Sequence, residues 1–313
     1  MNENDPVLRV EPATAIGAAV PWFREKLAAL GHVLNPCSAL ASELKLLEAY
    51  RAASLRQDVV KYRNAADLVE HQLRVRGTDF ITKALHRAEG RGWNEWHSRI
   101  DHLSSGVPNL IAPSAGSLSR NLSWETLLGA VCANFCEDVS FGEPDVLAEF
   151  QGKRIGLAAK VLYSANPTKQ LERIVEGAQQ GEDSGAGEIY VICNITQLIP
   201  HAELFETMHR SGVRSPRAVM ECVDGSLGDF QARHNSERWV ARLRERKALR
   251  AVILFAPMMV PTHEQPAGFI YTAIAAARED RDREFELAFH TACQSVLRHV
   301  PPNSLDQTTD GTP

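Results

Sequence analysis

The chain has 313 residues and a formal net charge of −5, with 44% hydrophobic and 23% charged residues. This composition is that of an ordinary globular protein and excludes a disordered or fibrous chain. The length exceeds that of a usual single domain, so we expect two domains, or one core with a large helical extension.

Membrane and secretory signals are missing from the sequence. No stretch approaches the roughly 18 apolar residues that cross a bilayer, and residues 1–10 contain acids where a signal peptide has a basic start. We therefore expect a cytoplasmic protein that does not contact a membrane. The six cysteines lack paired CxxC spacing, which favours reduced thiols in packed interiors over a metal site.

The net negative charge argues against a general nucleic-acid coat protein, because such proteins use excess positive charge to displace counterions from phosphates. Two segments are locally basic. Residues 51–99 hold ten Lys or Arg against six Asp or Glu, and residues 237–250 hold six against two. Each segment is compatible with a nucleic-acid contact or with a solvated helix face.

The first third of the chain is predicted to be helical. Apolar residues recur at three- and four-residue spacing in Ala39–Ala53 and again in Val59–Leu73. A stretch rich in glycine, proline and serine follows, from Gly106 to Gly116, and predicts a domain boundary near Leu118. We expect residues 1–117 to form an N-terminal helical domain that contacts a substrate or a partner.

Helices and strands alternate after this boundary. Ser123 is a suitable N-cap for a helix that runs to about Cys136. A turn at residues 142–144 leads into a strand over Val146–Phe150, and Gln151-Gly152 predicts a tight hairpin to a returning strand over Arg154–Leu162. The segment Asn166-Pro167-Thr168 opens a helix through about Gln179, and Glu188–Ile195 is a further strand.

The rest of the chain continues this pattern. We expect a helix over Ser236–Lys247, buried strands over Ala251–Val260 and Phe269–Ala275, and a closing amphipathic helix over Asp280–His299. Residues 118–300 would therefore form one α/β core. Residues 301–313 are predicted to be a disordered tail.

Two short segments of this core resemble a known family. Gly142-Glu143-Pro144-Asp145-Val146 and Gly156-Leu157-Ala158-Ala159-Lys160 are similar to the two halves of the PD-(D/E)xK nuclease motif. The order helix, strand, strand, helix and strand around them is also that of the family. The resemblance covers roughly residues 123–199. It implies a restriction-endonuclease-like mixed sheet flanked by helices, and a nuclease-like core over residues 118–300.

The resemblance also implies a chemistry for two residues. Cleavage of a phosphodiester needs an activated water and neutralised phosphate charge, which Mg²⁺ or Mn²⁺ held by carboxylates supplies. Asp145 would be a direct metal ligand. Lys160 would orient or deprotonate the attacking water, or stabilise charge on the phosphate. Alternative roles are a turn-closing aspartate and a lysine whose ammonium reaches solvent at a strand end.

One acid of the family motif is missing. Ala158 shares a strand face with Lys160 and stands where the second carboxylate is expected. Two glutamates could replace it as catalytic and metal-binding residues: Glu172 in the following helix, as in some members of the superfamily, or Glu125 in the preceding one. Glu125 could instead complement the helix dipole. Glu149 is a further candidate, for which we favour a solvated position near the hairpin.

Three polar residues at the start of the next helix are candidate substrate contacts. Gln170 resembles the helical glutamine of recombination-type and Mrr-like nucleases, although Ile174 stands where those relatives often carry tyrosine. Lys169 and Arg173 would face either DNA phosphates or solvent.

The first hypothesis for function is therefore Mg²⁺-dependent hydrolysis of DNA, in a setting of restriction or anti-phage defence that rests on analogy alone. Homodimerisation or a partner protein of a defence system is compatible with it. The second hypothesis is a catalytically inactive nuclease-like domain that binds nucleic acid or protein, supported by Ala158. The third is an unrelated α/β protein in which the motif occurs by chance.

Overall fold

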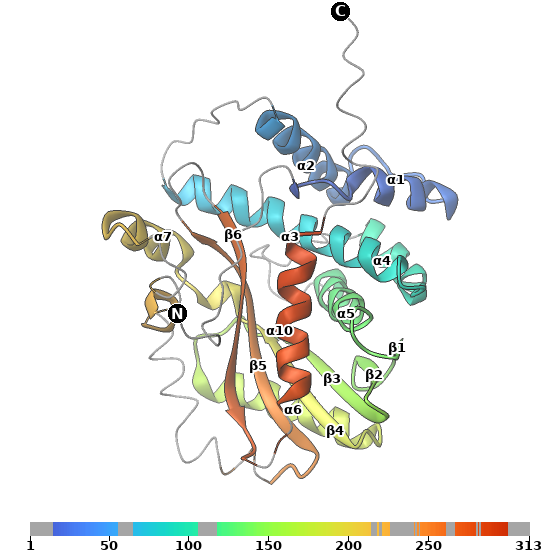
Figure 1. Ribbon diagram of the computed structural model, residues 1–313, viewed down its shortest axis with the longest axis vertical. Coiled ribbons are helices and arrows are strands. Elements are labelled where there is room, and N and C mark those ends of the chain that lie inside the picture. The colour runs from blue at the N-terminus through green and yellow to red at the C-terminus, as the bar shows by residue number, and fades with distance from the viewer. Residues whose placement is uncertain are drawn as a thin grey trace, which may run out of the picture.

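The fold is given by a computed structural model, which describes residues 15–55, 65–105, 118–213, 218, 221–225, 241, 243, 245–260, 267–279, 281 and 283–299. Its centre is a six-stranded mixed sheet with helices on both faces (Figure 1). The strands lie in chain order across the sheet. They are β1 (Asp138–Phe141), β2 (Val146–Phe150), β3 (Lys153–Val161), β4 (Glu188–Asn194), β5 (Leu249–Val260) and β6 (Ala267–Ala277).

Strand directions are antiparallel at both ends of the sheet and parallel in the middle. β1, β2 and β3 pair antiparallel, β3, β4 and β5 pair parallel, and β6 returns antiparallel to β5. The tight β2–β3 hairpin is confirmed, since Gln151 and Gly152 both have positive φ, as a two-residue primed turn requires. The sequence prediction had missed β1, a strand of only four residues that begins where the predicted helix to about Cys136 would have just ended.

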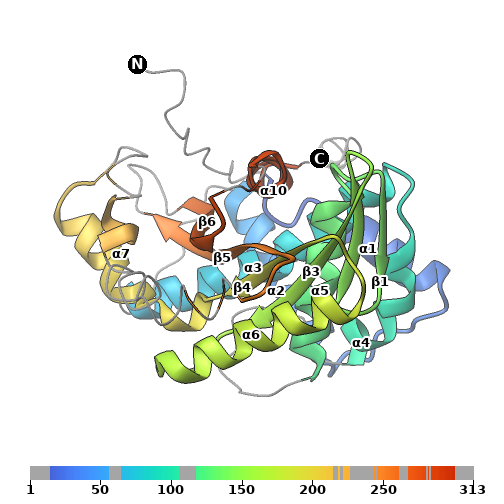
Figure 2. The ribbon, with the colours of Figure 1, turned by 90° about the horizontal axis from the view of Figure 1, so that it is seen from below.

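Helix α6 (Pro167–Asp183) packs on one face of the part of the sheet formed by β3 and β4 (Figure 2). Asn166 caps it by accepting a hydrogen bond from the Thr168 N–H, and Pro167 occupies its first turn, as predicted. The α6 face that contacts the sheet contains Gly177 and Gly181. An added Cβ would lie 3.0 Å from Ala158 Cβ at the first glycine and 2.7 Å from Ile189 at the second. These two glycines therefore allow an unusually close contact between the helix and the sheet.

The other face of the sheet is covered by α3 (Ala65–Glu89), α5 (Leu118–Cys132) and α10 (Glu284–Leu297). Phe255 of β5 contacts rings from α3 and α5, and Tyr190 of β4 lies 4.4 Å from the Phe285 ring of α10. Helix α5 begins at Leu118, so the predicted N-cap at Ser123 was wrong. Residues 118–122 contain no glycine or proline to stop the helix, and Ser123 is buried within it.

The remaining helices pack around α3 and the sheet edge. They are α1 (Val20–Ala29), α2 (Ala39–Leu55), the 3₁₀ helix η2 (Glu95–Arg99), α4 (Ile100–Ser105), the 3₁₀ helix η3 (Thr196–Leu198) and α7 (His201–Arg210). Side chains on both sides of the predicted boundary near Leu118 belong to one continuous hydrophobic core. The helix predicted over residues 236–247 falls mainly outside the described residues, and the tail at residues 301–313 falls entirely outside them.

A buried ion pair lies at the middle of α3. Lys83 Nζ is 2.8 Å from Asp79 Oδ2, and neither side chain has solvent exposure. Asp79 also accepts a hydrogen bond from the Gly17 N–H at 2.8 Å, while Lys83 donates to the Leu297 carbonyl at 3.1 Å. Gly17 has a φ of +71°, a conformation that favours glycine. The pair therefore connects α3 to the segment before α1 and to the end of α10.

Replacing Lys83 with methionine should destabilise the fold strongly. The substitution removes the cation that balances the buried Asp79 carboxylate, and such losses cost about 3–5 kcal/mol. Urea unfolding followed by circular dichroism would measure the change. The exposed Arg24–Glu48 pair offers the control, because Arg24→Met should cost less than about 1 kcal/mol. Equal small losses in both variants would contradict the role assigned to Asp79 and Lys83.

Candidate functional site

Asp145 lies immediately before β2, at the edge where β2 and β3 separate. The hairpin register pairs Val146 with Leu157, which places Asp145 beside Ala158. The Asp145 Oδ2 atom accepts a hydrogen bond from the Ala159 N–H at 2.7 Å. The carboxylate is thus held against the neighbouring strand, with only 19% of its side chain exposed.

Lys160 extends from β3 along the same face. Its Nζ atom is 3.6 Å from Asp145 Oδ2 and donates a hydrogen bond of 2.5 Å to Gln180 Oε1 of α6. The side chain is 8% exposed, so the ammonium has left most of its water. Its aliphatic part passes over Gly177, where an added Cβ would lie 2.9 Å from Lys160 Cε. A glycine at position 177 therefore makes room for the lysine.

Ala158 is fully buried beneath α6. Because its Cβ faces Gly177 at close distance, a glutamate or aspartate at this position would meet the helix backbone. The missing acid of the motif therefore has a physical explanation in this fold. Helix α6 occupies the space that a second carboxylate on β3 would need.

Glu125 reaches the same region from α5. Its Oε2 atom accepts a hydrogen bond of 2.8 Å from Arg99 Nη1, and both side chains are about five-sixths buried, with exposures of 16% and 17%. The Arg99 guanidinium also lies over the Phe141 ring, 4.1 Å from its centroid. Glu125 is close enough for its charge to act on both Asp145 and Lys160.

Asp145 is an unusually weak acid, mainly because its carboxyl group is buried. Burial raises the pKa of this carboxyl to about 7 from an ordinary 3.8, the Lys160 ammonium opposes the rise, and the negative charges of Glu125 and Glu143 add to it. Burial also raises the pKa of Glu125, against the lowering effect of Arg99. Two crowded carboxyl groups with raised pKa values are a common property of functional sites.

The other predicted site residues lie elsewhere on α6. Glu172, Lys169 and Arg173 are exposed, and Arg173 pairs with Glu176 at 2.8 Å. On the helical wheel Glu172 is about 140° away from Gly177, which faces the sheet. The acids whose charges act on Asp145 are Glu125 and Glu143. Of the two predicted replacement acids, Glu125 is the one whose charge affects the pKa of Asp145, and Glu172 is exposed on α6.

Gln170 is 3% exposed and donates a hydrogen bond of 2.7 Å to the Ser164 carbonyl, which closes the loop before α6. This placement gives it a structural partner within the chain. Glu149, for which a solvated position was favoured, is exposed on β2.

Two members of the site were not found from the sequence. Gln180 was missed because it lies one residue beyond the predicted end of α6, although its spacing from Gly177 and Gly181 places it on the same side of the helix. Arg99 was missed because it is distant in sequence from every motif residue. No local pattern marks it.

The carboxylate oxygens of Asp145 and Glu125 are the type of ligand that a hard divalent cation such as Mg²⁺ prefers. Among the residues that the structure describes, no group of three or more His, Cys, Asp or Glu side chains is arranged to hold a metal. Mg²⁺, however, usually keeps several waters and takes one or two carboxylates together with substrate phosphates. Asp145 and Glu125 supply that number of carboxylates. The negative charge of Glu125 helps to raise the pKa of Asp145, and a bound cation would offset that effect.

The six cysteines are free thiols, and all but the exposed Cys37 are buried or partly buried, so the expected packed interior is wrong for Cys37. Cys132 and Cys136, at helical spacing, are buried and half-buried, and burial raises the pKa of the Cys132 thiol well above its ordinary value. The Cys132 thiol therefore stays protonated, which disfavours metal binding by the two cysteines because thiolate is the metal ligand.

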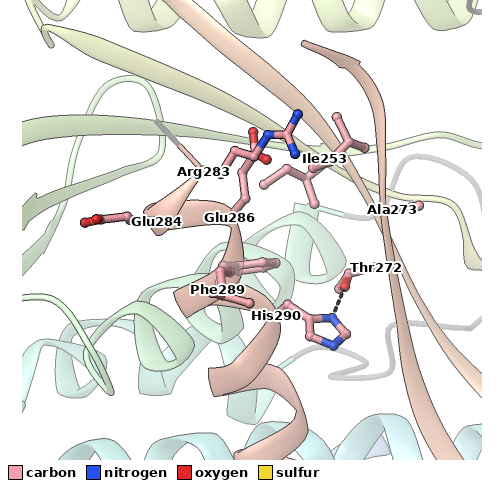
Figure 3. Close-up of a pocket in the computed structure, with 10 residues that line it drawn as sticks. Ile253, Thr272, Ala273, Arg283, Glu284, Glu286, Phe289 and His290 are labelled. Atoms are coloured by element: carbon pink, nitrogen blue, oxygen red, sulfur yellow. Dashed lines mark hydrogen bonds between the residues drawn. The ribbon is translucent and has the colours of Figure 1, made fainter. Parts of the chain in front are cut away.

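A separate hollow of about 450 Å³ lies between β6 and α10 (Figure 3). Its walls are largely apolar, and His290 contacts Thr272 Oγ1 at 2.5 Å across it. Burial lowers the pKa of His290, so its imidazole is neutral at pH 7. None of the residues that line this hollow belongs to the site formed by Asp145, Lys160, Glu125 and Gln180.

Comparison with known proteins gives no family: no family model matches the sequence, and neither a curated protein nor a solved structure matches it significantly. No described helix has the length and apolar character needed to cross a membrane. What can be said of function therefore rests on the geometry of the site.

The raised pKa of Asp145 predicts a pH dependence of stability. The folded state keeps a proton that the unfolded chain releases near pH 4, so this contribution is complete below about pH 4 and is lost as the pH rises towards 7. Without divalent cations, raising the pH from 5 to 8 should destabilise the wild type relative to Asp145→Asn by on the order of 2 kcal/mol. Urea unfolding at both pH values measures this difference. A difference that does not change with pH would show that the carboxyl titrates normally.

Proposed function

We propose that this protein is a metal-dependent nuclease of the PD-(D/E)xK type that hydrolyses phosphodiester bonds of DNA. The observation that carries the proposal is the meeting of Asp145 and Lys160. They are fifteen residues apart, one immediately before β2 and the other on β3, and come within 3.6 Å in a mostly buried position where the charge of Glu125 also acts on Asp145. The hairpin register brings the two residues together, but a turn aspartate and a solvated lysine would not need to be buried as these are.

The arrangement of elements supports the same proposal. Helix α5, the β2–β3 hairpin, helix α6 and the parallel strand β4 follow one another in the order of a restriction-endonuclease-like fold. Asp145 stands at the start of the hairpin and Lys160 near the end of its second strand. These are the positions that the family motif requires.

Each residue has a definite task in the proposed reaction. Asp145 and Glu125 would hold Mg²⁺ or Mn²⁺, which when bound would neutralise phosphate charge and acidify a water. Lys160 donates hydrogen bonds to the attacking water or to the phosphate oxygen on which charge develops. Gln180 Oε1 accepts a hydrogen bond from the Lys160 ammonium and so fixes its position. Glu125, supplied by α5, takes the place of the acid that Ala158 lacks.

DNA would be the substrate and, by analogy, restriction or anti-phage defence the setting. A homodimer that cuts both strands, or a partner protein that directs the cut, is compatible with this function.

A second function is favoured by one observation. Ala158 is packed against Gly177, and among the described residues the carboxylate within ion-pair distance of Lys160 is that of Asp145, while Glu125 and Glu143 act on Asp145 through their charges. A nuclease-like domain that has lost cleavage but still binds nucleic acid or protein would show such a reduced set of acids.

Plasmid cleavage separates the two functions. Purified wild type should nick or linearise supercoiled plasmid in Mg²⁺ or Mn²⁺, and Lys160→Met should be slower by about 100- to 1,000-fold, the usual effect of losing one donor to the transition state. Arg210→Met, which removes an exposed charge from α7, is the control for purification and net charge. If Lys160→Met cuts as fast as the wild type, the proposed mechanism fails; if no preparation cuts but DNA is bound, the second function is supported.

Metal binding tests the choice between the two glutamates. In calorimetric titration with Mn²⁺, Glu125→Gln should weaken binding by at least about tenfold, a loss seen even for residues that only support a metal ligand. Glu172→Gln should leave the affinity unchanged, because Glu172 is exposed on the far side of α6. The opposite result would reassign the second acid to Glu172.

A further inference from the structure

Among the residues that the structure describes, Arg99 brings the N-terminal helical region into the site. It ends the 3₁₀ helix η2, whose Trp96 is completely buried. The guanidinium rests on the Phe141 ring at 4.1 Å and donates to Glu125 at 2.8 Å. Phe141 in turn packs so closely on α5 that a Cβ at Gly129 would lie 2.9 Å from its ring. The cation is therefore held in place from two sides.

The charges around Arg99 are nearly balanced in the structure as it stands. The cations are Arg99 and Lys160, and the acids are Asp145, Glu125 and Glu143. Arg99 and Lys160 lower the pKa of Glu125 and Lys160 lowers that of Asp145, while Glu143 raises both. A divalent cation between Asp145 and Glu125 would reverse the sign of this balance. The negative charge of Glu125 would then be neutralised by the metal, and the Arg99 guanidinium would lack a counter-charge. Arg99 is too buried for water to stabilise its charge fully.

We propose that Arg99 exchanges Glu125 for a phosphate group of the DNA when a divalent cation binds the two carboxylates. This inference rests on the proposed function and adds to it a residue that binds substrate. A guanidinium presents its donors as a planar fork, which fits two oxygens of a carboxylate or of a phosphate equally well. The exchange replaces one anion with another at the same cation and restores the charge balance of the site.

The exchange predicts opposite effects of a single substitution on two ligands. Arg99→Gln should tighten binding of Mn²⁺ alone by several-fold, because the residue that competes for Glu125 is gone. In the Lys160→Met background, which prevents cleavage, Arg99→Gln should weaken binding of a 20-base-pair duplex in Mn²⁺ by roughly 10- to 100-fold, the value of a charge-assisted hydrogen bond. Without Mn²⁺ the same duplex should bind with unchanged affinity, since Arg99 is then occupied by Glu125.

The matched control is Arg281→Gln. Arg281 forms an equally buried pair with Glu286, at 2.6 Å and with 14% and 9% exposure, beside the hollow between β6 and α10. It should change none of the three affinities. Arg99→Lys, which keeps the charge but loses the fork, should lie between the wild type and Arg99→Gln. Urea unfolding of each variant confirms that it is folded under the assay conditions.

The outcomes separate the inference from the function on which it rests. If the wild type binds Mn²⁺ and DNA but Arg99→Gln changes neither, or weakens both in the same way, the exchange is refuted and the nuclease proposal stands. If the wild type binds neither ligand, both are overturned. The exchange is supported if Arg99→Gln binds Mn²⁺ more tightly and binds DNA more weakly in the presence of Mn²⁺. If Arg99 had a merely structural role, its loss would not increase the affinity for Mn²⁺.

Discussion

The close contact between α6 and the sheet is the constraint from which the site follows. Gly177 and Gly181 remove the side chains that would hold the helix away from β3 and β4. The same closeness brings Gln180 within hydrogen-bond distance of the Lys160 ammonium and fills the space above Ala158. One packing arrangement therefore both positions the lysine and excludes an acid from the neighbouring position. The loss of that acid is a property of the interface between helix and sheet as much as of one residue.

The electrostatics of the site follow from this geometry. Asp145 and Lys160 are desolvated together, and a buried pair of this kind is stable only when hydrogen bonds satisfy its remaining atoms. The Ala159 N–H serves the carboxylate and Gln180 serves the ammonium. The burial that raises the pKa of Asp145 thus comes with a supporting set of donors and acceptors. Such a site gains most from a ligand that brings positive charge to the carboxyl groups.

Local rules predicted much of the fold. Turn chemistry at Gln151-Gly152 and the Asn166-Pro167 helix start are encoded within a few residues, and both were read correctly from the sequence. Strand β1 and helix α7 were missed. The choice between Glu125 and Glu172 could not be made from the sequence, because it depends on which face of α6 meets the sheet. The place of Arg99 in the site was even harder to predict, because only tertiary packing brings η2 to α5. Residues that are distant in sequence come together through the packing of the core, and no local pattern in a single sequence predicts such contacts.

The ion pair of Asp79 and Lys83 has a consequence for how the polypeptide is held together. Because Gly17 hydrogen-bonds to one partner and Leu297 to the other, segments 280 residues apart in the chain close on a single point of α3. Non-covalent contacts thus join a segment near the start of the described chain to one near its end. Both segments therefore depend on the same ion pair, whose two side chains have no solvent exposure. The helical region and the sheet are accordingly two parts of one cooperative structure.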